Sequence, residues 1–600
     1  TISIRWFFGG YLAKTIQEGT VIAVSGKVCR YRGALQFINP GHQVIYDPHG
    51  TSLDRDELMP VYPASGKLSS NIIAGIIKIV LPEVPRLIRP WFDKAFLAKR
   101  SLMDRPTAIT AMHNPDDREH WLQARRRLAY DECMLMQLGI ALMRTREVSR
   151  PAHSLKWTPA IDSHIRARFP FELTAAQNGA IKEIVSDLAK NHPMNRLVQG
   201  DVGSGKTVVA VYAALTAVAN KKQVAIMAPT EILARQHYEK ITRYLDGSQV
   251  RTALLVGAMP GNAADRIRAE LANGDVHIVV GTHALLGETV KFRELALVIV
   301  DEQHKFGVEQ RTGLRGKGFA PHYLVMTATP IPRTLAMTVF GDLDVSTIDS
   351  LPPGRGVTHT SCVTPSKFDE VIDFTANKIR QGQQAYFIYP LVTPSPTLEL
   401  QAAEQALKKL SAGPLGEFGV GMIHGQMKAE QKNDIMRAFA AGRIKILVAS
   451  VVVEVGVDVS QANVIVINHA ERFGLAQLHQ LRGRVGRSAD DANCILVASP
   501  NNPIAKRRME ILCETSDGFK ISEEDLRLRG PGEIFGTRQH GMPELKVADL
   551  VEDFDLLRLA RRDAFKIIEE DPDLAAPHNQ QLRRMMLRMY AGKLTFITGA

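Results

Sequence analysis

Short apolar runs alternate with longer amphipathic stretches through the middle of the chain. Five such runs are Asn195–Gln199, Gln223–Ala228, Val276–Val280, Ala296–Val300 and His322–Met326. The runs have the character of strands, and the stretches between them are helix-like. Strands that are apolar on both faces and separated by helices predict a parallel sheet covered on both sides.

The same pattern occurs a second time, farther along the chain. The second series comprises Gln384–Val392, Val420–His424, Lys445–Ala449, Asn463–Asn468 and Asn493–Ala498. Between the two series lies Leu351–Gly356, whose Pro and Gly content is typical of a linker. The chain is therefore expected to be an α/β protein with two tandem parallel-sheet lobes, at residues 166–352 and 353–515.

Different patterns flank the two lobes. Residues 1–63 carry β-type runs, among them Val21–Ser25 and Leu35–Ile38. With their Gly-rich turns they predict a small barrel or sheet. Residues 64–165 have helical periodicity, including an Arg-rich amphipathic stretch from Asp116 to Arg146, and are expected to form a helical linker. Residues 516–600 combine a Gly/Pro-rich segment with a charged helical tail.

Charge is distributed unevenly along the 600 residues. The formal net charge is +11, and residues 1–168 hold 24 basic against 15 acidic side chains, so most of the surplus is near the N-terminus. A solvated basic surface is one explanation. A domain that meets nucleic-acid phosphates is the sharper one, and we favour it.

Membrane and secreted proteins are not favoured by the sequence. No uninterrupted apolar run reaches the ~18 residues of a membrane span. The apolar N-terminal stretch is interrupted by Arg5, and no cleavage site follows it. The five cysteines form no C-x-x-C pair, which argues against a zinc site or a disulfide framework and fits a cytoplasmic protein. Because the chain begins with Thr1, we expect it to derive from a longer protein.

A complete phosphate-loop motif follows the first apolar run. The segment Gly200-Asp201-Val202-Gly203-Ser204-Gly205-Lys206-Thr207 matches G-x-x-x-x-G-K-[ST]. Glycines at 200, 203 and 205, with Ser204 between them, let backbone N–H groups wrap the phosphates of ATP. Lys206 is expected to reach the β- and γ-phosphates, and Thr207 to bind Mg²⁺.

An acidic pair ends the fourth apolar run. Asp301 follows Ala296–Val300, where a carboxylate would face the loop that carries Thr207. We therefore predict that Asp301 holds the metal and that Glu302 orients or activates the attacking water. The alternative is an ordinary acidic turn after a strand.

The second lobe supplies candidate cations. The segment Gln477–Arg487 contains Arg484 and Arg487, and arginines three apart on a helix lie on nearly the same face. We predict that both act as arginine fingers on the γ-phosphate, which would make hydrolysis depend on closure of the lobes. Gln480 is a further candidate catalytic residue. A solvated basic face is the alternative, and it fits poorly with a run rich in Gly and Gln.

These motifs, in this order, resemble those of superfamily 2 helicases. The similar segments are Phe171–Gln177 (Q motif), Ala228–Glu231 and Gly281–His283 (strand contacts), Asp301–His304 (DExH box), Thr327–Pro330 (coupling motif), Val453–Val459 (motif V) and Gln477–Arg487 (motif VI). The resemblance covers about residues 169–500. It implies two RecA-like lobes and ATP hydrolysis coupled to stepping along a nucleic acid. It also implies that Gln177 contacts adenine and that Gly456 and Asp458 help to bind the nucleotide.

The segment Arg527–Leu545 resembles a translocation motif shared by the RecG family and the transcription-repair coupling factors, both of which move on duplex DNA. The resemblance implies a helical hairpin and loop that link the ATP state to movement along the duplex. Arg529, Arg538 and Gln539 are the expected DNA contacts. A plain Gly/Pro-rich surface loop is the alternative.

The N-terminal segment 1–63 is similar to the later strands of the wedge domain of the RecG family, an OB fold whose first strands we do not find. Exposed aromatic side chains in such a domain can stack on bases where a fork splits. Phe7, Phe8 and Tyr11 are the candidates for this role. Packing of these side chains inside the barrel is the alternative.

Together these resemblances imply an ATP-dependent double-stranded DNA translocase or helicase that remodels stalled forks and Holliday junctions in recombination and repair. Branched DNA and a single-stranded DNA-binding protein are the expected partners, and a monomer the expected state. The nearest alternative is another superfamily 2 duplex translocase such as a transcription-repair coupling factor, which would need a polymerase-binding module that we do not find. A DNA-binding scaffold with a vestigial nucleotide pocket is a third reading, and the complete set of motif residues argues against it.

Overall fold

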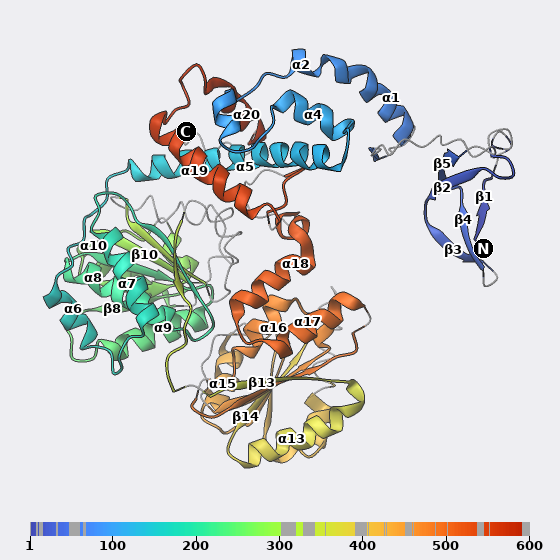
Figure 1. The fold of residues 1–600 in the computed structure, drawn as a ribbon. Helices are drawn as coiled ribbons and strands as arrows, with labels where there is room; N and C mark the ends of the chain where they lie inside the picture. The colour runs from blue at the N-terminus through green and yellow to red at the C-terminus, as the bar shows by residue number, and fades with distance from the viewer. Residues whose placement is uncertain are drawn as a thin grey trace. The chain divides into compact units, whose positions relative to one another are not determined.

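The structure is a computed structural model, and it divides into two compact units. It describes residues 2–590 apart from 8–9, 11, 13–15, 32–33, 47–59, 64–67, 258, 288, 302–319, 328–342, 355, 391–404, 406, 425–426, 428, 451–458, 460, 487, 501, 537–544 and 551. The first unit comprises residues 1–133, 545–548 and 576–582, and the second comprises residues 134–544, 549–575 and 583–600. Figure 1 shows the chain as a ribbon.

Five short strands open the first unit: β1 (Ser3–Arg5), β2 (Val21–Ser25), β3 (Val28–Tyr31), β4 (Ala34–Ile38) and β5 (Gly41–Tyr46). They form a three-stranded sheet with the order β1-β4-β3 and an antiparallel pair, β2-β5. The prediction of a small sheet is confirmed. Its identity as part of an OB-fold wedge stays a prediction.

Helices make up the rest of the first unit: α1 (Ser70–Val80), α2 (Val84–Leu87), α3 (Lys94–Ala98), α4 (Arg105–His113) and the first half of α5 (Arg118–Val148). Asp93 and Asp104 begin α3 and α4 as N-caps, because each carboxylate accepts a backbone N–H of the first turn. The long α5 confirms the helix predicted from Asp116 to Arg146.

A buried ion-pair cluster joins α4 to α5 in this unit. Arg105 and Arg127 each approach the Asp131 carboxylate to 3.1 Å, and Arg127 is fully buried. Burial raises the pKa of Asp131 to about 6, although both arginines act to lower it. The cluster therefore lies in a strongly desolvated position.

The first lobe of the second unit contains a seven-stranded sheet with the order β12-β6-β11-β10-β7-β9-β8. Its strands are β6 (Asn195–Gly200), β7 (Gln223–Met227), β8 (Thr252–Leu255), β9 (Ile278–Gly281), β10 (Leu295–Asp301), β11 (His322–Thr327) and β12 (Asp344–Ile348). All of its strand pairs are parallel. The five predicted strands are confirmed, and β8 and β12 are additional.

Helices cover this sheet on both faces: α6 (Pro159–Arg166), α7 (Ala175–Leu188), α8 (Lys206–Ala219), α9 (Glu231–Tyr244) and α10 (Gly261–Asn273). Side chains of one strand alternate between two apolar cores. Along β10, Leu297 and Ile299 pack with α7 and α8, whereas Val298 and Val300 pack in the core that includes Leu271 of α10. This explains why the strand is apolar from Leu295 to Val300.

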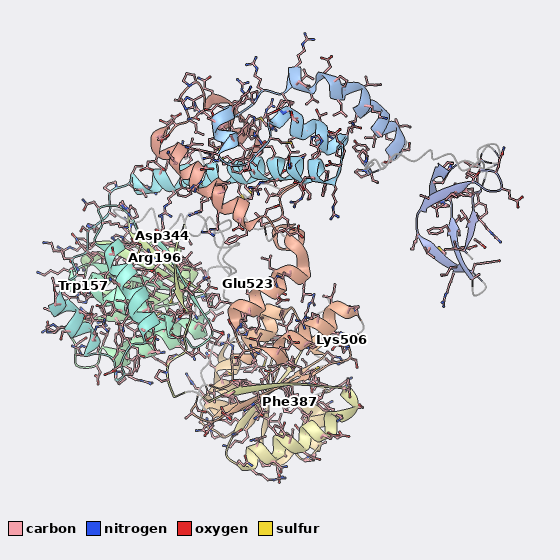
Figure 2. The ribbon with its side chains drawn as sticks, in the orientation of Figure 1. Trp157, Arg196, Asp344, Phe387, Lys506 and Glu523 are labelled. Carbon is pink, nitrogen blue, oxygen red and sulfur yellow. The ribbon has the colours of Figure 1, made fainter. Side chains whose placement is uncertain are left out.

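The second lobe repeats the arrangement with six strands in the order β13-β18-β17-β14-β16-β15. Its strands are β13 (Thr358–Val363), β14 (Gln384–Tyr389), β15 (Val420–Ile423), β16 (Ile446–Ser450), β17 (Ala462–Asn468) and β18 (Ala492–Val497). Its helices are α13 (Phe368–Arg380), α15 (Ala429–Ala440), α16 (Leu475–Arg482) and α17 (Pro503–Glu514). Phe387 of β14, labelled in Figure 2, is fully buried against the α13 face. Two tandem parallel-sheet lobes are thus confirmed.

Three helices follow the second lobe: α18 (Gly518–Gly536), α19 (Phe554–Glu570) and α20 (Gln580–Met589). The Gly/Pro-rich segment is helical as far as Gly536, and this helix includes Pro531. Tyr590 packs so closely on α5 that a Cβ at Gly139 would lie 2.6 Å from its ring, and its hydroxyl donates to Met136 O. Across the part of the chain described above, no helix is both long and apolar enough to cross a bilayer.

Candidate active site

The phosphate loop joins β6 to α8 through backbone conformations that require glycine. Gly203 and Gly205 have φ angles of 80° and 87°, in the left-handed region. A Cβ at Gly200 would lie 2.7 Å from both Ser204 Oγ and Ile348 O. The sequence therefore needs glycine at these three positions, and the resulting loop presents its backbone at the N-terminus of α8, where anions bind favourably.

Lys206 is the first residue of α8, and its side chain is buried within the loop. Its ammonium group donates to Gly200 O and Asp201 O, each at 2.8 Å. Ser204 Oγ is buried and has no hydrogen-bond partner among the described residues. Donors held at the end of a buried helix fit a phosphate chain, whose oxygens would replace the loop carbonyls as acceptors for Lys206.

Gln177 holds the phosphate loop from the side of α7. Its Oε1 accepts the Thr174 N–H in a capping box, and its Nε2 donates to Ser204 O at 2.9 Å. A cavity of about 600 Å³ lies beside the start of α7. The lining residues are Arg166, Phe169, Phe171, Glu172, Leu173 and Asn178. The cavity has the size and the aromatic wall for a purine, and base contact by Gln177 stays a prediction.

Asp301 ends β10 at the same sheet edge as the phosphate loop. Asp301 pairs with Met326 of β11, and Thr327 of β11 pairs with Gln199 of β6. The carboxyl ends of β10, β11 and β6 therefore lie close together at one edge of the sheet. This placement fits the predicted sharing of Mg²⁺ by Asp301 and Thr207. Glu302 lies outside the described residues.

The sequence analysis missed a histidine beside Asp301. His237 Nε2 lies 2.9 Å from Asp301 Oδ2, and both side chains are largely buried. His237 belongs to α9, the helix that begins after the Ala228–Glu231 motif. Because such a contact depends on how α9 packs, spacing along the chain offered no signal for it.

The structure corrects one prediction about the second lobe. Helix α16 ends at Arg482, and Gly486 has a φ of 72°, which an α-helix cannot contain. The prediction assumed a helical turn that begins at Arg484, and this premise is wrong because the chain leaves the helix before that residue. Gln480 lies within α16 and is half-buried, Arg484 lies in the turn after it, and Arg487 is outside the described residues.

The turn after α16 lies directly against the phosphate loop. A Cβ at Gly483 would lie 2.7 Å from the Cβ of Val202. One turn of helix earlier, His479 Nε2 lies 2.7 Å from Asp201 Oδ1. The phosphate loop and motif VI, which are predicted to act on one nucleotide, are thus in contact. Asp201, His479 and Gly483 take part in this contact, and none of them was among the predicted site residues.

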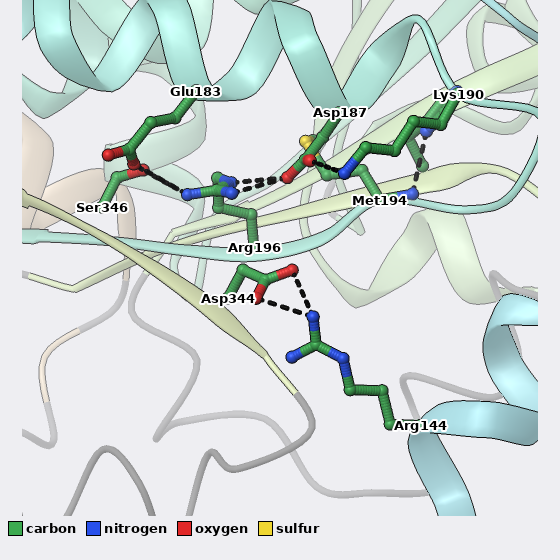
Figure 3. A network of polar contacts seen from close by, with 9 residues as sticks. Arg144, Glu183, Asp187, Lys190, Met194, Arg196, Asp344 and Ser346 are labelled. Atoms are coloured by element: carbon green, nitrogen blue, oxygen red, sulfur yellow. Dashed lines mark hydrogen bonds and ion pairs between the residues drawn. The ribbon is translucent and has the colours of Figure 1, made fainter. Parts of the chain in front are cut away.

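Arg196 braces the strand that leads into the phosphate loop. Its guanidinium donates to Asp187 and Glu183 of α7 and to Ser346 of β12, as Figure 3 shows. Nearby, Arg144 of α5 donates to both carboxylate oxygens of Asp344, at 2.8 and 3.0 Å. Charge-assisted bonds of this kind hold β6 between its neighbours and keep the loop in register.

The predicted DNA contacts are only partly described. Phe7 is 60% exposed, which fits base stacking, and its N–H donates to Asn39 Oδ1. The backbone of Arg529 lies in α18, but its side chain is outside the description. Phe8, Tyr11, Gly456, Asp458, Arg538 and Gln539 also lie outside the described residues. All of these roles stay predictions.

Comparison with known protein families separates the motor from the C-terminal region. Residues 174–338 match the DEAD/DEAH box helicase family and residues 366–489 match the helicase conserved C-terminal domain. Residues 515–596 match the C-terminal part of domain 3 of the ATP-dependent DNA helicase RecG.

Whole-chain relatives decide the family. The chain is 43% identical to the ATP-dependent DNA helicase RecG of Synechocystis sp. over 572 residues, which is 94% of this chain and 68% of that protein. It is 41% identical to RecG of Bacillus subtilis over 580 residues, covering 96% of this chain and 84% of that protein. This chain belongs to the RecG family.

Membership in the RecG family makes the chain an ATP-dependent DNA helicase of superfamily 2, as the motifs implied. A structure of RecG bound to a three-way DNA junction matches with a TM-score of 0.69 and 38% identity, over 92% of this chain and 73% of that one. The RecG-type domain at residues 515–596 favours this family over the transcription-repair coupling factors. ATP dependence also means that the phosphate loop has a nucleotide to bind.

Proposed function

We propose that this chain uses ATP to move along duplex DNA and remodel branched DNA, including stalled forks and Holliday junctions. The observation that carries the proposal is the match of 92% of the chain to RecG bound to a three-way DNA junction. The contact of motif VI with the phosphate loop supports it, because a motor must connect its nucleotide to both lobes.

In the proposed cycle, the first lobe binds the phosphates and holds the attacking water. Lys206 exchanges its carbonyl partners in the loop for phosphate oxygens. Mg²⁺ bound by Thr207 and Asp301 would offset negative charge on the phosphates. His237 keeps the Asp301 carboxylate in one orientation, and Glu302 would position the water.

The second lobe completes the site in this proposal. Arg484 and Arg487 supply positive charge to the γ-phosphate as it is transferred. Support comes from Gly483, because its close approach to Val202 brings the turn that carries Arg484 to the loop. Hydrolysis then depends on the contact between motif VI and the phosphate loop.

The remaining contacts are assigned to DNA and a protein partner. Phe7, Phe8 and Tyr11 would stack on unpaired bases at the branch point, and Arg529, Arg538 and Gln539 would grip the duplex. The surplus of basic residues among residues 1–168 supports contact with phosphates. The enzyme would act as a monomer, with a single-stranded DNA-binding protein as a partner at forks.

Strand separation on a labelled fork tests this function. The wild-type chain should release strands with ATP and Mg²⁺ but not with ADP, and should hydrolyse ATP faster with forked DNA than with linear duplex or single strands. Strongest stimulation by RNA, or no release from any fork, would contradict the proposal.

A further inference from the structure

Asp201 occupies a variable position of the phosphate loop, yet its carboxylate makes three hydrogen bonds. Oδ1 accepts the Val202 N–H at 2.7 Å and lies 2.7 Å from His479 Nε2. Oδ2 accepts the Gly518 N–H at 3.3 Å. One side chain of the first lobe therefore holds both α16 of the second lobe and the first residue of α18.

The partners of His479 define the directions of its two hydrogen bonds. Partial burial raises the pKa of the Asp201 carboxyl, but the bonds from His479 and Val202 outweigh this and hold that pKa below its usual value, so the carboxylate only accepts. Arg482 Nη2 lies 2.9 Å from His479 Nδ1, and a guanidinium only donates. In this arrangement His479 donates from Nε2 to Asp201 and accepts at Nδ1 from Arg482.

Arg482 extends the network to the turn between α17 and α18. Its Nη1 donates to Leu512 O at 2.9 Å and to Thr515 O at 2.8 Å, at the C-terminal end of α17. A cation there satisfies helix carbonyls that otherwise lack a donor. The turn is held on one side by Arg482 and on the other by Asp201, which bonds the N-terminus of α18.

We propose that Asp201 is a positioning residue that connects the phosphate loop, through His479 and Arg482, to the helix that carries the translocation motif. The proposal rests on the function proposed above, and it assigns to Asp201 the coupling of ATP turnover to strand separation. Residues Arg527–Gly536 of that motif lie in α18, so the start of the helix transmits a displacement to them.

Lys206 explains how the nucleotide reaches this network. Its ammonium group donates to Gly200 O and Asp201 O. These are the backbone carbonyls of Asp201 and of the residue before it. When phosphates compete for Lys206, these two carbonyls lose a charged donor and the backbone at Asp201 must adjust. Because the carboxylate is bonded at both oxygens, the adjustment is passed to His479 and Gly518.

Four variants of the full chain test the connection: Asp201→Asn, His479→Leu, the double variant of both, and His479→Gln. Glutamine can imitate these two hydrogen bonds, because its amide nitrogen donates to Asp201 while its amide oxygen accepts from Arg482. Asp246→Asn is the matched control, since Asp246 is exposed in the same lobe. Strand separation on a fork and ATP turnover are measured together, and turnover is also measured without DNA.

We expect Asp201→Asn and His479→Leu each to reduce the strands separated per ATP hydrolysed by about 10-fold, a coupling of ordinary size. The double variant should lose no more than the worse single variant, and His479→Gln should stay within about 3-fold of wild type. A wild-type ratio for Asp201→Asn, or losses that multiply in the double variant, would overturn the proposal.

Turnover without DNA separates the two hypotheses. If the wild-type chain separated no strands, the function proposed above would fail. Turnover would still test the connection, because we expect Asp201→Asn and His479→Leu to change it by factors that do not multiply in the double variant. Thermal unfolding of each variant identifies loss of fold, and His479→Gln retains both hydrogen bonds if His479→Leu proves unstable.

Discussion

Two aspartates, Asp131 and Asp201, are each bonded to cationic or histidine side chains, but they serve their regions differently. Asp131 lies between Arg105 and Arg127 inside one helical region, and burial raises its pKa to about 6. Asp201 lies in the phosphate loop, and its hydrogen bonds hold its pKa below the usual value. The surroundings of Asp131 therefore disfavour its ionised form, whereas those of Asp201 favour it.

The difference lies in what each carboxylate joins. The Asp131 cluster connects two neighbouring helices, so its loss should act on stability. Asp201 of the first lobe contacts His479 of the second lobe, 278 residues away along the chain, and Gly518 at the start of α18, 317 residues away. We therefore expect the ion pairs of Asp131 to serve packing within one region, and the hydrogen bonds of Asp201 between regions to serve function.

Replacing Lys206, in the phosphate loop that also contains Asp201, should have the largest effect, and the effect is on ATP turnover. Lys206→Ala removes the cation that we propose to bind the phosphates, so ATP turnover should fall by at least about 100-fold. Affinity for a DNA junction, measured by fluorescence anisotropy, should stay within about 2-fold because the proposed DNA contacts lie elsewhere. Lys182→Ala, at an exposed position of α7, is the control and should turn over like wild type. Unchanged turnover in Lys206→Ala would refute the site assignment.

Replacing Arg127 tests whether the Asp131 cluster contributes to stability. Arg127→Met leaves Asp131 buried with only Arg105, so the free energy of unfolding of this region should fall by about 3 kcal/mol. Chemical denaturation measures the loss, and Arg118→Met, at an exposed position, is the control. Turnover per folded molecule should not change. A stable Arg127→Met variant with impaired turnover would contradict the view that the Asp131 cluster serves stability while Asp201 serves function.

Gly483 offers a smaller perturbation of the lobe contact. Its φ of −67° suits alanine, so Gly483→Ala should not strain the backbone. The added Cβ would lie 2.7 Å from that of Val202 and should push motif VI away from the loop. DNA-stimulated turnover should fall by about 10-fold, since misplacement of catalytic groups by a fraction of an ångström is costly. A wild-type rate with an unchanged melting temperature would show that the contact is not needed.

The smallest effect is a pH dependence of stability. Because the folded-state pKa of Asp131 is raised to about 6, its contribution to stability is present below the unfolded value near 4 and is lost as the pH rises through 6. The stability of wild type relative to Asp131→Asn should therefore decrease between pH 5 and pH 7. Denaturation of both chains across this range measures it, and a difference that increases with pH would contradict the assigned pKa shift.

Much of the fold could be predicted because it follows local patterns. Strands such as β10 are apolar on both faces and flanked by helices, which is enough to predict two parallel-sheet lobes. The strands β8, β12 and β13 were missed because they carry weaker apolar runs, including the polar segment Thr358–Val363 at the edge of the second sheet. The phosphate loop was found because its chemistry requires consecutive residues.

The side chains that complete the site were harder to predict. His237, His479 and Asp201 act through contacts between elements far apart in sequence, and no fixed spacing marks them. Arg484 was predicted to lie on a turn of helix, whereas α16 ends at Arg482 with Gly483 as its C-cap, and Gly486 has a left-handed backbone. Glycines within the motif were the signal that could have revised that expectation.

The number of base pairs separated per ATP hydrolysed tests most directly whether Asp201 couples turnover to movement. We would measure it on one fork for the wild-type, Arg127→Met and Asp201→Asn chains under conditions in which all three are folded. The expected result is an unchanged ratio for Arg127→Met and a clearly lower ratio for Asp201→Asn. Equal ratios for the three chains would contradict the account.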